Sequence, residues 1–292
     1  MHGTHLSRFP QYSKRSGFTL VELAIVLVIV GLLIGGILVA QSMISTAKIN
    51  SQVRQFQQFD TAVANFITRY NAAPGDYAGL YSASELSTYV DYAQKATDNG
   101  YIDFRCYDGV WSGYAPNGYD EYSEAAWFWV SLQRGVGFKQ DGATFTAIPN
   151  ATSFNISSSV RNGPKSAISD KASLVAISTY YTWPSETIAA YVLANYSGLK
   201  TSDNSFTTAA NPVITPSQAM GIDKKMDDGR PATGMIRPWN YSSVIDYLGW
   251  YVDGVFCSNG TIYNASDSTD VCALTVQIMS QSGGIPGRGT TY

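Results

Sequence analysis

The sequence predicts an α+β protein in which a long N-terminal helix, membrane-spanning in its first half, packs against an antiparallel β-sheet in a globular domain. An apolar run covers residues 18–40, and an amphipathic stripe continues from it to residue 70. Pro and Gly within residues 71–76 then end the helical pattern. Strand-like runs of aromatic and β-branched residues follow in the C-terminal part.

The apolar run is long enough to cross a membrane. Its 23 residues, 18–40, would form a helix of about 34 Å. The basic residues Lys14 and Arg15 precede it, so we expect the N-terminus in the cytoplasm and the bulk of the chain outside. A secretory signal peptide fits less well, because the run is too long and Leu38 is a poor residue three positions before a cut after Ala40.

A plain signal anchor would explain the basic flank and the apolar run, but it does not explain Glu22. A carboxylate one turn into an apolar span costs roughly 2.5 to 3.5 kcal/mol at the bilayer centre and less near the interface. Such a residue indicates a function, and we expect a positively charged partner for it.

The residues around Glu22 carry a resemblance to a known family. The segment at residues 14–22 reads KRSGFTLVE and resembles the processing site of type IV prepilins and type II secretion pseudopilins. The resemblance implies that residues 1–17 are a basic leader, that prepilin peptidase cuts between Gly17 and Phe18, and that it methylates the new amine of Phe18. It also implies that Glu22 neutralises the N-terminal amine of the adjacent subunit during assembly.

The same resemblance implies the location and the partners. The protein would lie in the inner membrane before assembly and then in a periplasmic or extracellular filament. Its partners would be other pilin-like subunits, in a homo- or hetero-polymer, together with the peptidase and the inner-membrane assembly platform. The fold would be pilin-like. Many relatives have a helix-breaking proline in the apolar half, whereas this chain has only Gly35 and Gly36 near Val39.

The helix is expected to run on from residue 18 to Tyr70 as one element of about 80 Å, followed by an extracytoplasmic globular domain at residues 72–292. The stripe that would face this domain consists of Ile49, Val53, Phe56, Val63, Phe66 and Tyr70. We further predict helices at Glu121–Arg134 and from a capping box at Thr215, Pro216, Ser217 and Gln218. Predicted strands are Leu174–Tyr181, Gly249–Cys257 and Val271–Met279.

The composition favours a globular chain outside the cytoplasm. Of the 292 residues, 45% are hydrophobic, but only 14% are charged, which leaves a neutral polar surface. The formal net charge is −3, and loss of the first 17 residues would leave 16 basic and 22 acidic ones, so no nucleic-acid partner is expected. Both histidines, His2 and His5, lie in the leader. A mature chain without histidine excludes most hydrolytic triads and zinc sites, and we expect no enzyme.

Three aspartates form the one candidate metal site. Asp223, Asp227 and Asp228 lie in the stretch IDKKMDDGRPATG, which resembles a segment of some large prepilin-like proteins. Carboxylates are ligands that calcium prefers, although the spacing is not that of an EF-hand. The alternative is a solvated turn whose acids pair with the neighbouring basic side chains, Lys224, Lys225 and Arg230.

The cysteines predict one disulfide. Cys257 and Cys272 flank a loop rich in turn-forming residues, and outside the cytoplasm such a pair is expected to be bonded. The loop also matches the disulfide-bounded loop near the C-terminus of many type IV pilins. Cys106 is left over and is expected to be a buried free thiol.

The predicted function is a structural filament subunit, in a type IV pilus or a secretion pseudopilus. The alternative is a minor or tip subunit whose domain binds a glycan, DNA or a secreted substrate, which the length of 292 residues favours. The cysteine pair favours a pilus, and Glu22 disfavours the large tip pseudopilin, which usually lacks this glutamate.

Overall fold

The computed structural model describes residues 17–81, 102, 124–139, 163–179, 188–194, 212–238, 251–252 and 255–278. Contacts divide the chain into two compact units, Met1–Ser45 and Thr46–Tyr292. The second part of the long helix, residues 46–70, therefore belongs to the same unit as the sheet.

Helix α1 runs from Leu20 to Tyr70, which confirms the long N-terminal helix. It ends where the sequence turns to Pro and Gly. Asn71 takes up a left-handed conformation with φ of 50°, and Gly75 follows with φ of 91°. Asparagine and glycine accept this conformation at low cost, so the chain can leave the helix at this point.

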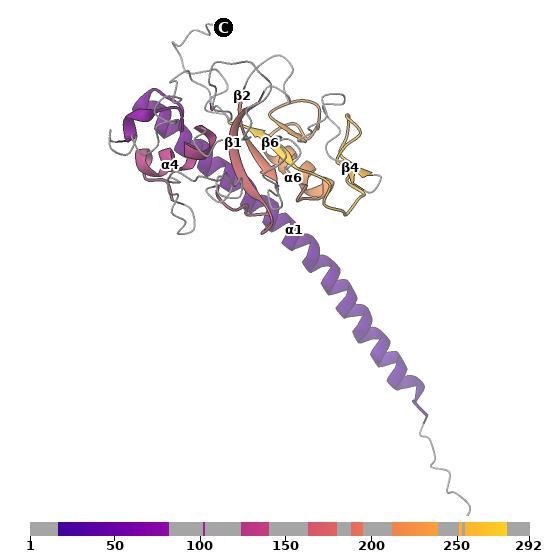
Figure 1. Ribbon diagram of the computed structural model, residues 1–292. Helices are drawn as coiled ribbons and strands as arrows, with labels where there is room; N and C mark the ends of the chain where they lie inside the picture. Colours follow the sequence, from indigo (N-terminus) through magenta and orange to yellow (C-terminus); the bar gives the residue numbers. More distant parts are fainter. Residues whose placement is uncertain are drawn as a thin grey trace, which may run out of the picture. The chain divides into compact units, whose positions relative to one another are not determined.

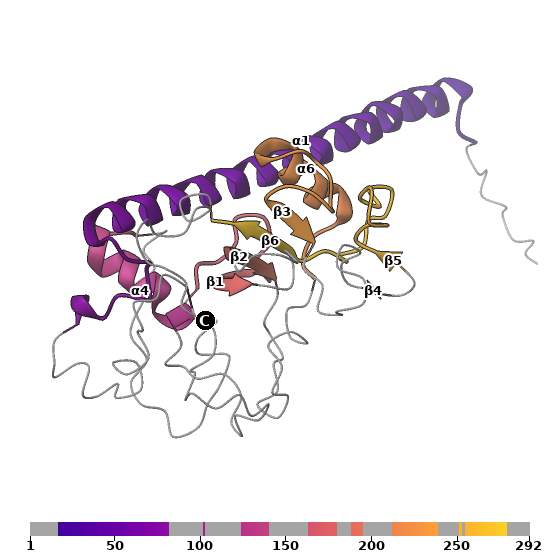
Figure 2. The ribbon, with the colours of Figure 1, turned by 90° about the horizontal axis from the view of Figure 1, so that it is seen from above.

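The second part of α1 is amphipathic and lies across one face of the sheet (Figure 2). Phe56 and Phe59 are fully buried and meet the ring of Tyr191, with centroid distances of 6.0 and 5.6 Å. The rings of Phe59 and Trp129 lie 4.9 Å apart, edge to face. Burial of a large aromatic side chain contributes roughly 1.5 to 3 kcal/mol, so this seam supplies much of the attachment between helix and sheet.

Two glutamines give this seam a fixed register. The side chain of Gln55 donates to the carbonyl oxygen of Lys165 at 2.7 Å and accepts from the amide of Ala167 at 3.0 Å. Gln52 accepts from the hydroxyl of Ser166 at 2.6 Å. Because buried polar groups must find partners, sliding α1 by one residue would leave these groups unpaired.

The sheet has four antiparallel strands in the order β1-β2-β6-β3. Strands β1, β2 and β6 are labelled in Figure 1, and β3 is labelled in Figure 2. These strands are β1 (Ser173–Thr179), β2 (Ile188–Ala194), β6 (Leu274–Gln277) and β3 (Ile236–Pro238). The register pairs Tyr191 with Val276 and Val276 with Ile236, which places the C-terminal strand in the middle of the sheet. Residues 274–276 are therefore paired on both sides.

In the described part of the chain, two further helices flank this core. Helix α4 (Glu124–Val136) contacts the short 3₁₀ helix η1 (Ala78–Leu80) and strand β1. Arg69 and Tyr70, at the end of α1, both donate to the carbonyl oxygen of Gly135, at 2.9 and 3.1 Å. Helix α6 (Pro216–Met226) begins with the predicted capping box, in which Thr215 and Gln218 each accept from the other's backbone amide.

Several predicted elements differ from the structure. The single strand expected at Gly249–Cys257 is wrong, because the stretch contains two short strands, β4 (Tyr251–Val252) and β5 (Val255–Phe256), that pair antiparallel. The helix predicted at Glu121–Arg134 is confirmed with its described bounds moved to Glu124–Val136. Strands β2 and β3 were not predicted, since β2 is rich in alanine and β3 has only three residues and ends in proline.

Candidate functional site

The expected processing junction lies at the exposed end of the described chain. Phe18 is 80% exposed, and both Gly17 and Thr19 are exposed as well. A methyl group added at Gly17 would meet no atom within 4 Å. Packing against the described residues therefore sets no requirement for glycine at this position.

Glu22 has a local role in addition to its charge. Its Oε2 accepts from the amide and from the hydroxyl of Thr19, at 2.9 and 3.0 Å, and its own amide donates to the Thr19 hydroxyl at 3.3 Å. This is the reciprocal pattern of a capping box, with Thr19 before the helix and Glu22 in its first turn. Glu22 thus satisfies helix N-terminal donors and places a negative charge at the positive end of the helix dipole.

The first part of α1 offers an apolar surface on all sides. The large hydrophobic side chains from Phe18 to Ile44 are exposed, with exposed fractions from 43% at Val30 to 86% at Leu20. Among the described residues, α1 is the one helix long and apolar enough to cross a membrane, by length and composition. A soluble monomer would not leave so large an apolar surface in water, so this surface must be covered by lipid or by other helices.

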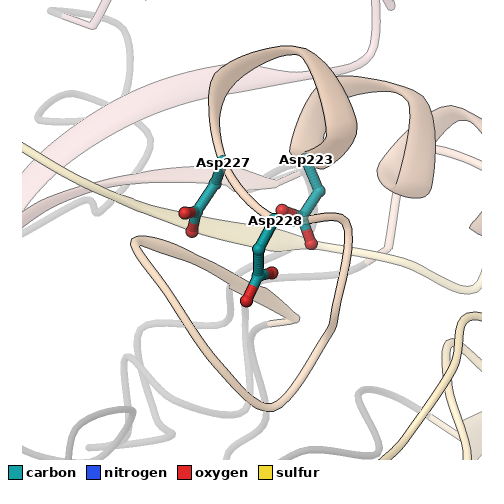
Figure 3. A group of neighbouring side chains, drawn as sticks. All are labelled: Asp223, Asp227 and Asp228. Atoms are coloured by element: carbon teal, nitrogen blue, oxygen red, sulfur yellow. The ribbon is translucent and has the colours of Figure 1, made fainter.

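The three aspartates lie together at the end of α6 and on the turn after it (Figure 3). Each of Asp223, Asp227 and Asp228 contributes one carboxylate oxygen to a group in which all three oxygens lie within 4.8 Å of one another. The three residues named as a candidate calcium site therefore lie near one another. Calcium binding by them is untested and stays a prediction.

Most oxygens of this cluster already accept hydrogen bonds. Asp227 accepts from the amides of Met235 and Ile236, at the start of β3, and Asp228 accepts from the amide of Arg230 and the hydroxyl of Thr233. The alternative, a turn whose acids pair with the neighbouring basic side chains, fits Asp228 in part, because the hydrogen bond from Thr233 and, after it, the charge of Arg230 are among the causes that lower the pKa of the Asp228 carboxyl. Backbone amides also hold the turn.

Asp223 differs from the other two because it is buried. It accepts from the amide of Gly229 at 3.0 Å and from the hydroxyl of Tyr263 at 2.8 Å. Burial is the largest effect on the Asp223 carboxyl and raises its pKa to about 6. The two hydrogen bonds lower the pKa, and the charges of Asp227 and Asp228 raise it. A calcium ion would have to bind the ionised form and replace donors that already satisfy these oxygens.

Tyr263 belongs to the loop closed by the predicted disulfide, which is present between Cys257 and Cys272. We call residues 257–272 the disulfide loop. Its interior is ordered by backbone hydrogen bonds, including Asn264 to the carbonyl of Cys257 at 3.0 Å. Cys272 also pairs with Ile214 just before α6. The disulfide loop, α6 and the aspartate turn therefore form one connected substructure.

Comparison with known families decides the nature of the N-terminus. Residues 12–38 match the family described as the prokaryotic N-terminal methylation motif, and this match is followed by the long apolar helix. The N-terminus is therefore consistent with that of a type IV prepilin-like protein. No curated protein and no solved structure matches the chain.

The methylation motif spans 27 of 292 residues and includes Gly17, Phe18 and Glu22. The match concerns only the N-terminus and its processing. No curated protein or solved structure matches the globular domain. The motif and the apolar helix fit a membrane-anchored precursor.

Sequence reasoning missed two residues at these sites. Thr19 was read only as part of the processing motif, although the pattern Thr-x-x-Glu at Thr19 and Glu22 is itself a capping-box signal. Tyr263 could not have been found, because it lies 40 positions from Asp223 and only the fold brings them together. Cys106, expected to be a free thiol, lies outside the described residues.

Proposed function

We propose that this prepilin-like chain is a structural subunit of a type IV pilus-like or type II secretion pseudopilus filament. The observation that carries the proposal is the methylation motif at residues 12–38 at the start of a helix whose apolar side chains are exposed. Prepilin peptidase removes residues 1–17 and methylates the amine of Phe18. The mature chain stays anchored in the inner membrane by α1 until the assembly platform adds it to a polymer.

The physical basis of assembly is the exchange of lipid for protein around α1. Helix association in an apolar medium depends on close packing and on polar pairing, because lipid tails already satisfy the hydrophobic effect. Gly31, Gly35 and Gly36 lack side chains that would hold a neighbouring helix away. In the proposed polymer, Glu22 and the amine of Phe18 on an adjacent copy supply charges that would otherwise be unpaired in an apolar interior.

A minor or tip subunit remains the second candidate, because 292 residues is long for a major pilin. In that role the globular domain would bind a glycan, DNA or a secreted substrate. Copy number separates the two roles, since a major subunit makes up most of the filament and a tip subunit is present in a few copies.

The test is to shear filaments from cells that produce the chain and to count its copies against the other subunits by quantitative mass spectrometry. We expect the mature chain in the sheared fraction. Retention of all mature chain in the membrane, under conditions in which other pilin-like subunits of the same cells are sheared off, would contradict the filament role.

A further inference from the structure

The second part of α1 has an outer face that the domain leaves uncovered. The face consists of residues at helical spacing, all of them exposed: Lys48, Ser51, Arg54, Gln58, Thr61 and Asn65. We call it the outer face of α1. Its two charged residues are both basic, and the single acid of α1 beyond Thr46, Asp60, is buried on the opposite side near Tyr191.

The two basic side chains are not used within the described part of the chain. Lys48 and Arg54 make no ion pair with any described residue. Arg69, further along α1, differs because it donates to the carbonyl oxygen of Gly135. The outer face thus carries two positive charges on a rigid helix, among short neutral polar side chains that allow close approach.

In a polymer built on α1, this face lies beside neighbouring subunits. If outer faces met one another, Lys48 and Arg54 would face like charges, and such contacts cost several kcal/mol when they are desolvated. An acidic surface opposite the outer face would avoid this cost and attract both basic residues.

The disulfide loop supplies such a surface. Between Cys257 and Cys272 it contains two acids, Asp267 and Asp270, and no Lys or Arg. Both acids reach solvent. Hydrogen bonds from the amide and hydroxyl of Thr269 lower the pKa of the Asp267 carboxyl, so it stays ionised in mildly acidic surroundings.

The same loop is pre-organised for a contact. Besides the disulfide, the amide of Asn259 donates to the carbonyl of Ile262 at 3.1 Å, and the side chain of Asn259 accepts from the amides of Thr261 and Ile262 at 2.9 Å. Ile262 is 61% exposed and is the only exposed large hydrophobic side chain beyond Ile44 in the described ranges. A fixed loop loses little conformational entropy on binding, and an apolar contact can accompany its charges.

We propose that the outer face of α1 docks against the disulfide loop of a second copy of this chain, with Lys48 and Arg54 opposite Asp267 and Asp270. The proposal rests on the filament role proposed above. The new element is the pair of surfaces that meet, the basic outer face of α1 on one copy and the acidic disulfide loop on the other. Each copy carries both surfaces, at different positions. One copy can therefore bind two neighbours through the same contact, as a helical polymer requires.

Anionic lipid is the competing partner for basic residues that follow a membrane span. Lys48 lies close to the end of the exposed apolar run at Ile44, within the reach of a charged membrane surface. Arg54 lies ten residues beyond Ile44 along α1, about 15 Å at the helical rise, where salt screens a surface charge with a Debye length of about 8 Å. Substitution of Arg54 therefore distinguishes binding of a second copy from binding of anionic lipid.

The experiment is a charge exchange in the full chain. Lys48→Glu with Arg54→Glu, and Asp267→Lys with Asp270→Lys, are each expected to lower the amount of chain in sheared filaments about fivefold, and the four substitutions together should restore it to about half of wild type or more. Lys171→Glu and Asp170→Lys, at an exposed turn before β1, are matched controls that should assemble like wild type. Failure of the combined variant to recover, while the controls assemble, would overturn the proposal.

A second measurement keeps the docking contact separate from the filament role. Membranes from cells with two isotopically distinct copies are treated with a carbodiimide, which joins amines to carboxylates in contact. We expect a cross-link between Lys48 of one copy and Asp267 or Asp270 of the other, in filaments and in any smaller oligomer. Absence of this cross-link from every oligomer overturns the proposal, even if filaments form. If wild type forms no filament but the cross-link is present, the filament role fails and the docking contact stands.

Lipid binding is tested directly with vesicles of phosphatidylglycerol and phosphatidylethanolamine. Because α1 inserts the chain in any vesicle, binding is compared between vesicles with and without phosphatidylglycerol. Loss of the phosphatidylglycerol dependence in Arg54→Glu, together with wild-type filament content, would show that the outer face serves the membrane and would overturn the proposal. A phosphatidylglycerol dependence that is equal in wild type and Arg54→Glu supports the proposal.

Discussion

The hydroxyl of Tyr263 donates a 2.8 Å hydrogen bond to Oδ2 of Asp223, and this bond joins the disulfide loop to helix α6. Both side chains are buried. Burial of Tyr263, next to the Asp223 carboxylate, raises the pKa of its phenol far above the usual range, so the phenol stays a donor at every physiological pH. The pair therefore couples the loop to the domain.

Replacement of this donor should destabilise the domain. In Tyr263→Phe the Asp223 carboxyl loses a buried donor, and we expect a loss of about 1 to 3 kcal/mol in the free energy of unfolding. Urea denaturation of the detergent-solubilised chain measures it. Tyr77→Phe is the control, because the Tyr77 ring packs on Tyr70 without a hydrogen bond in the described chain. Equal midpoints for the two variants would contradict a role of the bond.

Acidification should stabilise the chain through Asp223. Its pKa of about 6 in the folded state lies above the ordinary value of 3.8, so the folded state binds the proton more tightly than the unfolded state. The stability from this group is fully present below the unfolded value and is lost as the pH rises through about 6. Between pH 7 and pH 4, wild type should gain in Tm relative to Asp223→Asn. A pH-independent difference would show that folding leaves the pKa of Asp223 at its ordinary value.

The disulfide should contribute to stability through the unfolded state. Closing a loop of about 15 residues is worth about 3 kcal/mol in the chain-entropy model. The double variant Cys257→Ala, Cys272→Ala keeps small apolar side chains at two buried positions. We expect it to match wild type treated with reductant, both with a lowered urea midpoint. A double variant as stable as oxidised wild type would contradict the role of the bond.

The sequence predicted those elements for which local signals agree. Helix α1 has an unbroken apolar pattern and a clear stop, and α6 begins with a capping box that the structure contains. Strand β2 is fully buried where its side chains are described, from Ala190 to Ala194. Such a strand shows no alternation, so period-two patterns cannot find it.

The candidate sites likewise differ in how much of them the sequence alone can predict. The processing motif is contiguous at residues 14–22, so its resemblance could be seen in the sequence alone. The aspartate turn is also contiguous, but its chemistry depends on Gly234 and Tyr263. A side chain at Gly234 would meet the Asp227 carboxylate at 1.9 Å, so the turn closes only around glycine. Tyr263 comes from another loop, and its contact with Asp223 is a property of the fold.

Glu22 has two roles that substitutions can separate. Glu22→Gln keeps an oxygen that can accept from Thr19 but removes the charge, whereas Thr19→Ala removes the cap and keeps the charge. If neutralisation of the amine drives assembly, Glu22→Gln should lose more than tenfold in sheared filaments, because an unpaired buried charge costs several kcal/mol. Thr19→Ala loses only about 1 kcal/mol of helix capping and should still assemble. The reverse order would assign Glu22 to capping alone. Both variants should be compared at equal membrane-fraction levels.

The central claim is that the chain is processed as a prepilin, and the intact mass of the membrane-extracted protein tests it most directly. Packing against the described residues needs no glycine at residue 17, so Gly17→Ala serves as a variant that changes the junction and leaves this packing untouched. We predict that wild type lacks residues 1–17 and carries one added methyl group on Phe18, while Gly17→Ala keeps the leader. A mature wild-type chain that starts at Met1, or near Gln41 as after signal-peptide cleavage, would contradict the account.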